Sequence, residues 1–461
     1  MPASILAPIP PDPILFAEIL EAAGEPFALL HASARSSDPL ARFSFVAALP
    51  DRSSGRLDPL ADDPDAGDLA PSAGFGGFED GGAPDLLRRA PRWVGVLPYE
   101  ARRDLERPGW TPKDARPPAM LERPEWRRYR ATLAIDHDRG EVFSIGLTRA
   151  DALDLLAIID RGARRARPPS SRPDEPSPAI EIADDEPPDR HIARILAAKE
   201  LILSGDLYQV NLARRIRVAL RRGHLTGVYS RLARAAPTPL GALLTGFGEG
   251  AAVLSTSPEL FLLAEPSARG GFGRLLTAPI KGTRPRGADA PADLALAREL
   301  DADPKERAEL TMIVDVERND LGRVAETGSV RLIRAPHVVT HRTVHHRLAL
   351  LSARARGEFS REDVVSAMLP SGSITGAPKV RAMEVIASLE PRRRGLYTGA
   401  FGCVSHAGRL TLAMAIRTLV MRGGEGEYWT GGGIVADSDP EREVEETRWK
   451  ALQLERAARG P

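Results

Sequence analysis

The sequence predicts an α+β or mixed fold for this 461-residue chain. Short apolar segments of strand-like composition are interspersed, in no regular order, with segments whose apolar residues recur at helical spacing. A parallel sheet would need strands and helices to alternate regularly, and the chain lacks that alternation. Stretches rich in proline and acidic residues interrupt the pattern and divide the chain into two ordered regions.

The N-terminal region, residues 1–165, contains both ordered and loop-like segments. Its ordered segments are short apolar runs at 26–32 and 43–49, two strands around a turn at 131–147, and a helical pattern at 151–166. Residues 51–90 are crowded with Asp, Gly, Pro and Ser, and such a composition buries little apolar surface. We therefore expect a long loop over 51–90.

A proline-rich segment separates this region from the rest of the chain. Seven prolines fall between 161 and 190, so residues 166–190 are expected to form a linker. The region that follows, 190–458, carries most of the predicted elements. Its predicted strands lie at 208–220, 251–264 and 274–283, and its predicted helices at 190–206, 291–302, 304–312, 361–369, 378–389 and 440–458.

Charge and composition exclude several classes of protein. The chain has 63 basic and 63 acidic side chains, and without a basic excess nucleic acid is not an expected partner. Cys403 is the single cysteine, which excludes an intrachain disulfide framework and a multi-cysteine metal site. No apolar run is long enough to span a membrane, and no secretory signal begins the chain. A cytoplasmic, globular protein is expected.

Lys281 is the most informative single residue. It follows an apolar approach and enters a turn rich in Gly and Pro, at residues 279–287. A lysine held against apolar backbone can have a lowered pKa, and a neutral amine is a nucleophile. The alternative is a solvated loop lysine, because most lysines are surface charges.

Acidic residues in two predicted helices are candidate ligands of a divalent cation. Glu443 and Glu446 are three residues apart, so a helix places both carboxylates on one face. Glu309 lies in a second helix, near its start. Mg²⁺ prefers carboxylate oxygens and would relieve the repulsion between the two like charges. The alternative is a solvated acidic face paired with Arg442 and Lys450.

Two stretches that contain glycines could bind an anion through backbone N–H groups. Residues 371–379 precede a helix with Pro378 at its start, and a helix start favours a carboxylate or phosphate. Residues 430–434 contain three successive glycines, which would let a ligand approach the backbone closely. Each stretch could instead be a tight turn.

Histidines cluster at 337–346, but their spacing argues against a zinc site. The β-branched neighbours favour an extended chain, in which His337, His341 and His345 would spread over roughly 26 Å. A single histidine that acts as an acid, a base or a hydrogen-bonding group is the better functional interpretation. A purely structural histidine is the alternative.

The motifs, in this order, resemble those of the chorismate-utilising enzymes. The matching segments are DLYQVNLARR (206–215), STSPEL (255–260), PIKGTRPRG (279–287), RAELTMIVDVERNDLGRV (307–324), SGSITGAPKVRAMEVI (371–386), YTGAFG (397–402), AIRT (415–418) and GGGIVADSDPEREVEETRWKA (431–451). The resemblance implies chorismate as substrate. It also implies an α+β fold of two large, mostly antiparallel β-sheets packed together, with helices outside.

Two positions indicate the branch of the family. Isochorismate and salicylate synthases carry a lysine that activates water where this chain has Gln209, and an amide cannot act as a base. Lys281 in PIKGT resembles the aminodeoxychorismate synthase component I branch, whereas anthranilate synthase component I typically has alanine there. Residues 26–46 and 93–107 also look like the opening of that branch. Anthranilate synthase component I and a catalytically silent chorismate-binding protein remain alternatives.

The resemblance implies a role for each matching residue. Lys281 would attack C2 of chorismate, Glu259 would protonate the departing C4 hydroxyl, and His346, rather than His345, would orient the ring. Mg²⁺ would be bound by Glu309, Glu443 and Glu446. The residues implied in substrate binding are Gln209, Thr283, Thr375, Gly376, Tyr397, Arg417, Gly432, Gly433 and Lys450.

The resemblance also implies a second substrate and a partner. Ammonia would add at C4 to give 4-amino-4-deoxychorismate, a precursor of 4-aminobenzoate and folate. Cys403 lies within the synthase region, so the chain offers no glutaminase Cys-His-Glu set. The ammonia must therefore be free or be supplied by a separate glutamine amidotransferase subunit, which is the expected partner.

Overall fold

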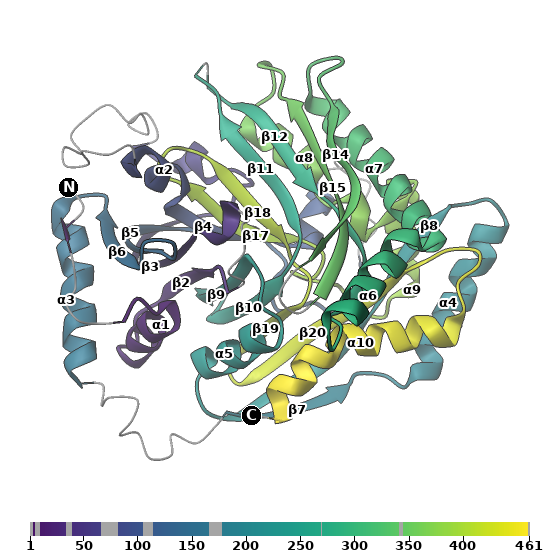
Figure 1. Cartoon of the computed structure of the whole chain (residues 1–461), viewed down its shortest axis with the longest axis horizontal. Helices are drawn as coiled ribbons and strands as arrows, with labels where there is room; N and C mark the ends of the chain where they lie inside the picture. The colour runs from purple at the N-terminus through teal and green to yellow at the C-terminus, as the bar shows by residue number, and fades with distance from the viewer. Residues whose placement is uncertain are drawn as a thin grey trace.

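The computed structural model describes residues 3–4, 10–33, 39–65, 82–104, 114–165, 178–268, 270–340 and 344–459. Within them, twenty strands join into one continuous hydrogen-bonded network (Figure 1). Every pairing between named strands is antiparallel. Antiparallel strands need no helical crossover between them, which explains why strands and helices follow no regular order in the sequence.

The network divides at β5 (Glu125–Asp136) into two arms. The first arm continues through β3 (Phe43–Ser54), β2 (Phe27–His31), β9 (Leu240–Phe247), β10 (Ala251–Ser257), β19 (Thr418–Arg422), β20 (Glu425–Ile434), β8 (Gln209–Arg222) and β7 (Ala179–Asp184). The second arm continues through β4 (Pro91–Leu97), β17 (Ala400–Ser405), β18 (Leu410–Met414), β11 (Leu260–Pro266), β12 (Phe272–Ala278) and β15 (Val344–Arg354), which also pairs with β13 (Ile280–Pro285) and β14 (Arg331–Thr340).

The two arms pack face to face over a shared apolar core. Phe247 and Val253 of the first arm meet Val96 and Phe401 of the second in one buried cluster. The expected pair of packed antiparallel sheets is therefore present, with one difference. Because β5 is 12 residues long, one of its edges pairs with β4 at residues 125–128 and with β6 (Glu141–Gly146) at residues 131–136. Through β5 the two layers are continuous.

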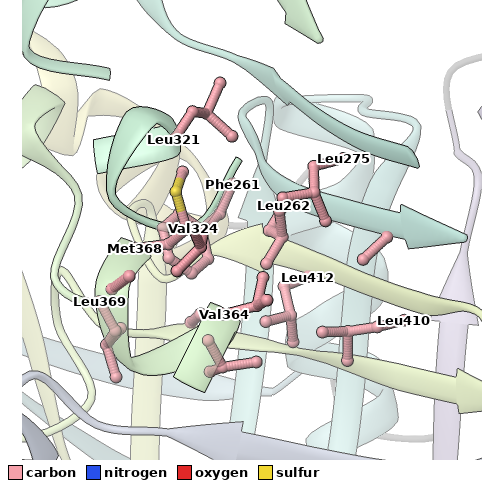
Figure 2. Packing of buried hydrophobic residues seen from close by; sticks show 14 of the residues in the cluster. Phe261, Leu262, Leu275, Leu321, Val324, Val364, Met368, Leu369, Leu410 and Leu412 are labelled. Atoms are coloured by element: carbon pink, nitrogen blue, oxygen red, sulfur yellow. The ribbon is translucent and has the colours of Figure 1, made fainter. Parts of the chain in front are cut away.

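Helices cover the outer faces of both arms, as expected. On the second arm, Leu321 and Val324 of α7 (Pro304–Val324) and Val364 of α8 (Arg361–Met368) pack against β-strand residues such as Leu262 and Leu412 (Figure 2). On the first arm the covering helices are α1 (Pro13–Ala22), α3 (Arg149–Arg165), α5 (Leu225–Ala235) and α10 (Pro440–Arg459). Two more helices, α4 (Pro188–Leu203) and α9 (Lys379–Leu389), pack on β8.

Local sequence explains where the helices near the site begin. Asp303 precedes α7, and its carboxylate accepts hydrogen bonds from the backbone N–H groups of Lys305 and Glu306, with Pro304 in the first turn. Asp289 caps α6 (Ala290–Ala302) through the N–H of Ala292 in the same way. These caps set the direction in which α7 carries Glu309.

Several sequence expectations need correction. The single strands expected at 251–264 and 274–283 are each two strands, β10 and β11, and β12 and β13. The expected loop over 51–90 contains the end of β3, a short 3₁₀ helix (Pro59–Asp62) and α2 (Gly82–Arg89). The expected linker contains β7, because Ile180 and Ile182 share one face and the strand adds to the edge of β8. Finally, α7 continues to Val324, well beyond residue 312, because the whole of its apolar face is buried.

Candidate active site

Glu259 lies in the connection between β10 and β11, where it is almost completely buried. Its side chain is 4% exposed, and the hydroxyl of Ser373 donates a 2.8 Å hydrogen bond to Oε1. Burial raises the pKa of this carboxyl to about 7, although the Ser373 hydrogen bond and the charge of Lys281 act in the opposite direction. A carboxylic acid that keeps its proton near neutral pH is suited to act as a general acid.

Lys281 lies on β13, close enough to Glu259 and Glu446 to interact electrostatically with both carboxylates. The side chain is partly buried. The next residue, Gly282, has a φ of +82°, and a Cβ there would come within 2.7 Å of Leu300 and 2.9 Å of Glu306. Glycine at 282 therefore allows β13 to approach α6 and α7 closely, which fixes the path of the strand that carries Lys281.

The three predicted metal ligands gather around a lysine. The ammonium of Lys305 lies 3.9 Å from Glu309 Oε1 and 3.4 Å from Glu443 Oε1, and Glu446 also contributes to the raised pKa of Lys305. Glu446 itself forms a 2.7 Å ion pair with Lys450. The structure thus brings the predicted carboxylates from α7 and α10 together around the ammonium of Lys305.

The chemistry of this cluster fits Mg²⁺. All three predicted ligands offer carboxylate oxygens, and Glu443 Oε2 is buried without a hydrogen-bond partner. The Cα of Gly432 lies beside the same oxygen, since a Cβ on Gly432 would be 2.9 Å from it. As the side chains lie, however, no group of three His, Cys, Asp or Glu residues in the described ranges could hold a metal ion. Metal binding would require Lys305 to move away.

Gln209 lies at the start of β8 and is completely buried, yet neither Nε2 nor Oε1 of its amide has a hydrogen-bond partner. Leaving a buried amide unpaired costs free energy, so such groups commonly mark a site where a ligand or water binds. Gly433 faces this amide so closely that a Cβ would be 2.3 Å from Nε2.

Backbone glycines line the same part of the site. Gly376 has a φ of +141°, and a Cβ there would lie 2.1 Å from the carbonyl oxygen of Gln209. Only glycine fits that position. The adjacent Thr375 is buried, and its hydroxyl donates a 2.9 Å hydrogen bond to the carbonyl oxygen of Ser371. The 371–379 stretch therefore forms a tight turn that packs directly on β8, through the two-residue strand β16 (Gly376–Ala377).

Tyr397 and Arg417 both interact electrostatically with Tyr428. Tyr397 stacks on Trp429 with ring centroids 6.0 Å apart, and burial raises its pKa to about 12, so the phenol remains a hydrogen-bond donor. Arg417 has a φ of +50° and lines one small cavity together with His346 and Thr256. A guanidinium is a natural partner for a carboxylate.

The two adjacent histidines differ in their contacts. His346 Nδ1 lies 2.9 Å from the hydroxyl of Thr283, on the strand that carries Lys281. His345 instead contacts Asp293 and Thr340, each at 2.9 Å. The geometry therefore favours His346 over His345 as the histidine that faces the site.

The expected single extended run at 337–346 is wrong. The chain reverses between β14 and β15, which pair with each other, so Val339 lies opposite His346. Residues 341–343, including His341, lie outside the described residues.

Lys450 of α10 reaches the glycine strand as well. Its ammonium donates a 2.8 Å hydrogen bond to the carbonyl oxygen of Gly431, besides its ion pair with Glu446. The predicted role for Lys450 beside Gly432 and Gly433 is therefore geometrically reasonable, since the residue that Lys450 contacts directly precedes both glycines on β20.

Sequence reasoning missed a set of buried polar side chains behind Glu259. Ser371, Ser373 and Glu317 are each at most 3% exposed, and they are connected by hydrogen bonds. The motif at 371–379 by itself predicts only a source of backbone N–H groups. The signal that the sequence offers is the pair of serines on either side of Gly372, together with the acidic residues of the helix predicted from residue 304.

Comparison with known proteins identifies the family. Residues 38–456 match the family described as chorismate binding enzyme, which confirms the resemblance inferred from the motifs. The chain is 38% identical over 385 residues to anthranilate synthase component 1 of Streptomyces coelicolor, a match that covers 79% of this chain and 72% of that protein. It is 45% identical over 244 residues to aminodeoxychorismate synthase component 1 of Klebsiella aerogenes, which covers 53% of this chain and 52% of that protein.

A third relative, aminodeoxychorismate synthase of Streptomyces griseus, is 37% identical over 371 residues, which covers 78% of this chain and 49% of that protein. The chain thus spans about half the length of both aminodeoxychorismate synthases. Among solved structures, anthranilate synthase component I from Streptococcus pneumoniae aligns with a TM-score of 0.72 at 27% identity, over 90% of this chain and 92% of that one. The described residues contain no helix long and apolar enough to cross a membrane.

Proposed function

Since this chain belongs to the family of chorismate binding enzymes, we propose that it aminates chorismate at C4, as component I of an aminodeoxychorismate synthase. The single observation that carries the proposal is the position of Lys281 on β13, within electrostatic range of the buried acid Glu259. A nucleophilic amine and a protonated carboxyl that face one substrate can act at C2 and C4 of the same ring.

The first half of the proposed reaction breaks the bond between C4 and its hydroxyl. Glu259 gives its proton to the hydroxyl, which leaves as water, while the neutral amine of Lys281 forms a bond to C2. The two ring double bonds each shift by one position, so the electrons of the broken C4–O bond remain with the leaving oxygen. The substrate is then covalently attached to Lys281, and Glu259 is a carboxylate.

The second half reverses the shift. Ammonia bonds to C4, the double bonds move back, and Lys281 leaves C2 as a neutral amine. The new C4 ammonium returns one proton to Glu259, which restores the starting state. The product keeps its enolpyruvyl group and is 4-amino-4-deoxychorismate.

The remaining site residues would bind and orient chorismate. Arg417 and Tyr397 would bind the enolpyruvyl carboxylate, and Gln209 would use its unpaired amide. The other substrate contacts would come from Thr283, Thr375, Gly376, Gly432, Gly433 and Lys450, with His346 beside the leaving group. Mg²⁺ held by Glu309, Glu443 and Glu446 would neutralise the ring carboxylate when bound.

The ammonia would come from a separate glutamine amidotransferase subunit. The Klebsiella aerogenes relative is named as a component 1, a name that implies a second component. Within the described residues the one cysteine, Cys403, is buried and unpaired, and burial raises its pKa to about 12. Such a thiol is a poor nucleophile and does not suit a glutaminase.

Anthranilate synthase component I is the second candidate. The match to the Streptomyces coelicolor protein of that name covers more of this chain than the match to the Klebsiella protein does. In that reaction ammonia would add at C2 in place of Lys281, and the lysine would have no covalent role.

The product of the reaction separates the candidates. The purified chain is incubated with chorismate, Mg²⁺ and ammonium, and the products are identified by mass spectrometry and fluorescence. We expect 4-amino-4-deoxychorismate from the wild-type chain and strongly reduced product from Lys281→Ala. Lys281→Arg keeps a long polar side chain but offers no amine nucleophile, so its product should be reduced as strongly. Fluorescent anthranilate as the main product would refute the proposal, and unconsumed chorismate would indicate a silent binder.

A further inference from the structure

Two serine hydroxyls connect the acid Glu259 to a second buried carboxyl, Glu317 of α7. Ser373 Oγ lies 2.8 Å from Glu259 Oε1, Ser371 Oγ lies 2.9 Å from Ser373 Oγ, and Glu317 Oε1 lies 2.5 Å from Ser371 Oγ. The exposed fraction of the side chain falls along this line of hydrogen bonds. It is 4% for Glu259, 3% for Ser373, 2% for Ser371 and 0% for Glu317. An unbroken line of hydrogen bonds therefore runs from the active site into the core.

Local packing holds the two hydroxyls in place. Ser371 precedes a short 3₁₀ helix (Gly372–Ile374), and its Oγ accepts a 3.0 Å hydrogen bond from the N–H of Ser373. Between the serines, Gly372 lies against α7, where a Cβ would be 2.1 Å from Cγ1 of Val316. Because glycine permits this approach, Glu317, the next residue of α7, reaches Ser371.

The surroundings of Glu317 allow it both to hold and to release a proton. Burial raises the pKa of this carboxyl, which favours the protonated form. The hydrogen bond from Ser371 and the charge of Lys379 oppose that effect and would stabilise the carboxylate once it forms. Lys379 is itself fixed by hydrogen bonds of 2.8 Å to Asp320 and 3.1 Å to the carbonyl oxygen of Pro370. The hydroxyl of Thr277 lies 3.4 Å from the other oxygen of Glu317.

The direction of the hydrogen bonds follows from proton counting. Each serine hydroxyl has one proton to donate and can accept another bond. When Glu317 is protonated and Glu259 is not, all donors can point from Glu317 through Ser371 and Ser373 to Glu259. When the charges are reversed, the same hydroxyls can point the other way. The two arrangements differ by the transfer of one proton between the carboxyls.

We propose that Glu317 is the reserve proton donor of Glu259, and that Ser371 and Ser373 pass the proton between them. This inference rests on the proposed function, in which Glu259 is the general acid. Glu317 touches no substrate and acts through the two serines, so it is a relay and positioning residue rather than a catalytic one.

The relay balances within one turnover. After Glu259 has protonated the leaving hydroxyl, the proton of Glu317 moves to Ser371, the proton of Ser371 moves to Ser373, and the proton of Ser373 moves to Glu259 Oε1. Glu259 is neutral again while the substrate is attached to Lys281, and the negative charge lies on Glu317 near Lys379. When the C4 ammonium protonates Glu259 at Oε2, the proton on Oε1 returns along the same path. No proton from solvent is needed.

Four variants test the relay: Glu317→Gln, Ser371→Ala, Ser373→Ala and the control Ser405→Ala. Ser405 is 1% exposed, and its hydroxyl accepts a backbone hydrogen bond outside the relay. The three relay variants should lower kcat for chorismate about 10- to 100-fold and leave KM within about twofold, because they impair proton transfer and not binding. Ser405→Ala should change neither constant, although it removes a buried hydroxyl of the same kind.

A solvent isotope measurement separates a relay from a structural effect. In mixtures of H₂O and D₂O, a relay with several protons in transit gives a curved dependence of kcat on deuterium content in the wild type. The Ser373→Ala variant should give a linear dependence. A Glu317→Gln protein with wild-type kcat and a wild-type isotope effect would overturn the relay.

Infrared spectroscopy tests the relay without catalysis. The wild type should show the carbonyl band of buried, protonated carboxylic acids at pH 7, and Glu317→Gln should remove a part of its intensity in addition to the part that Glu259→Gln removes. A band unchanged by Glu317→Gln would overturn the relay even if chorismate is aminated. If the wild type makes anthranilate or consumes no chorismate, the proposed function fails, and the infrared result still decides whether Glu317 stores a proton.

Discussion

The hydroxyl of Ser373 donates a 2.8 Å hydrogen bond to Glu259, a carboxyl that is 4% exposed and whose pKa burial raises to about 7. Glu259 acts in its protonated form in the proposed mechanism. The kcat for chorismate should therefore fall as pH rises through about 7, the pKa that burial gives this carboxyl. Glu259→Gln should lower kcat by about 10²- to 10⁴-fold. A pH profile of kcat that stays flat from pH 6 to pH 9 would contradict this role.

The same raised pKa affects stability. In the unfolded chain Glu259 has a pKa near the ordinary value of 4.5, so between about pH 4.5 and pH 7 the folded state holds a proton that the unfolded state has lost. Stability due to this group therefore falls as pH rises across that window. Glu259→Gln lacks this effect. Measured by urea titration, the free energy of unfolding of the variant should therefore increase relative to that of the wild type between pH 5 and pH 8. If the free energies of unfolding of the variant and the wild type differ by the same amount at pH 5 and at pH 8, Glu259 is not a buried, protonated carboxyl.

The unpaired amide of Gln209 predicts a conflict between stability and binding. Gln209→Leu keeps the volume but removes a buried amide without a partner, so it should stabilise the fold by about 1–3 kcal/mol. The same change should raise the KM for chorismate, because the amide would no longer bind the substrate. Gln453→Leu is the matched control: the Nε2 of that buried glutamine donates a 3.0 Å hydrogen bond to the hydroxyl of Tyr428 and only its Oε1 is unpaired, so its replacement should stabilise less than that of Gln209. A Gln209→Leu protein less stable than the wild type would argue that the amide already has a partner in the free protein.

Gly376 should tolerate no side chain. A Cβ would lie 2.1 Å from the carbonyl oxygen of Gln209, and the φ of +141° is unfavourable for any other residue. Gly376→Ala should lower the free energy of unfolding by about 2–4 kcal/mol, from the clash and the backbone strain together. Gly322 of α7 is the control, because a methyl group added there would meet no atom within 4 Å, and Gly322→Ala should stabilise by about 0.5–1 kcal/mol. Denaturant unfolding of both variants checks the contrast, and similar values for the two would refute it.

Lys305 should compete with Mg²⁺. Its ammonium lies 3.4 Å from Glu443 and 3.9 Å from Glu309, where the cation would bind, and the side chain is half exposed and free to move outward. Lys305→Met removes the competing charge and should tighten Mg²⁺ binding about three- to tenfold, measured by calorimetry without substrate. Lys199→Met serves as the control, since it changes a lysine whose ammonium donates to the carbonyl oxygen of Ser438. Weaker Mg²⁺ binding by the Lys305 variant would indicate that the cation binds elsewhere.

Local patterns in the sequence predict most of the helices, α3, α4 and α6 to α10, but they miss α1, α2, α5 and many of the strands. The helix expected at 361–369 occurs as Arg361–Met368, because Ser360 and Asp363 form a reciprocal cap that depends on neighbouring residues only. The strand β7 escapes prediction because it lies in a proline-rich segment and is stabilised by pairing with β8, a contact that composition does not record. The reversal between β14 and β15 escapes it for a similar reason, since β-branched residues favour strand without indicating where it turns.

The site residues show the same contrast between features that one segment encodes and features that depend on contacts between distant segments. Gln209, Gly433 and Gly376 meet where linear motifs lie on adjacent strands, so the resemblance could place them together. The hydrogen bonds from Glu259 to Glu317 depend on α7 packing against Gly372. The position of Lys305 among the carboxylates depends on how α7 and α10 face each other. Neither arrangement is encoded in the spacing of one segment.

The central claim, a covalent bond between Lys281 and C2 of chorismate, can be measured directly. The purified chain is mixed with chorismate and Mg²⁺ in the absence of ammonia, the reaction is quenched, and intact-protein and peptide mass spectra are recorded. We expect an adduct equal to chorismate minus water on the peptide that contains Lys281, absent from Lys281→Arg and depleted on addition of ammonium. A wild-type chain that converts chorismate to 4-amino-4-deoxychorismate yet never carries that adduct on Lys281 would contradict the claim.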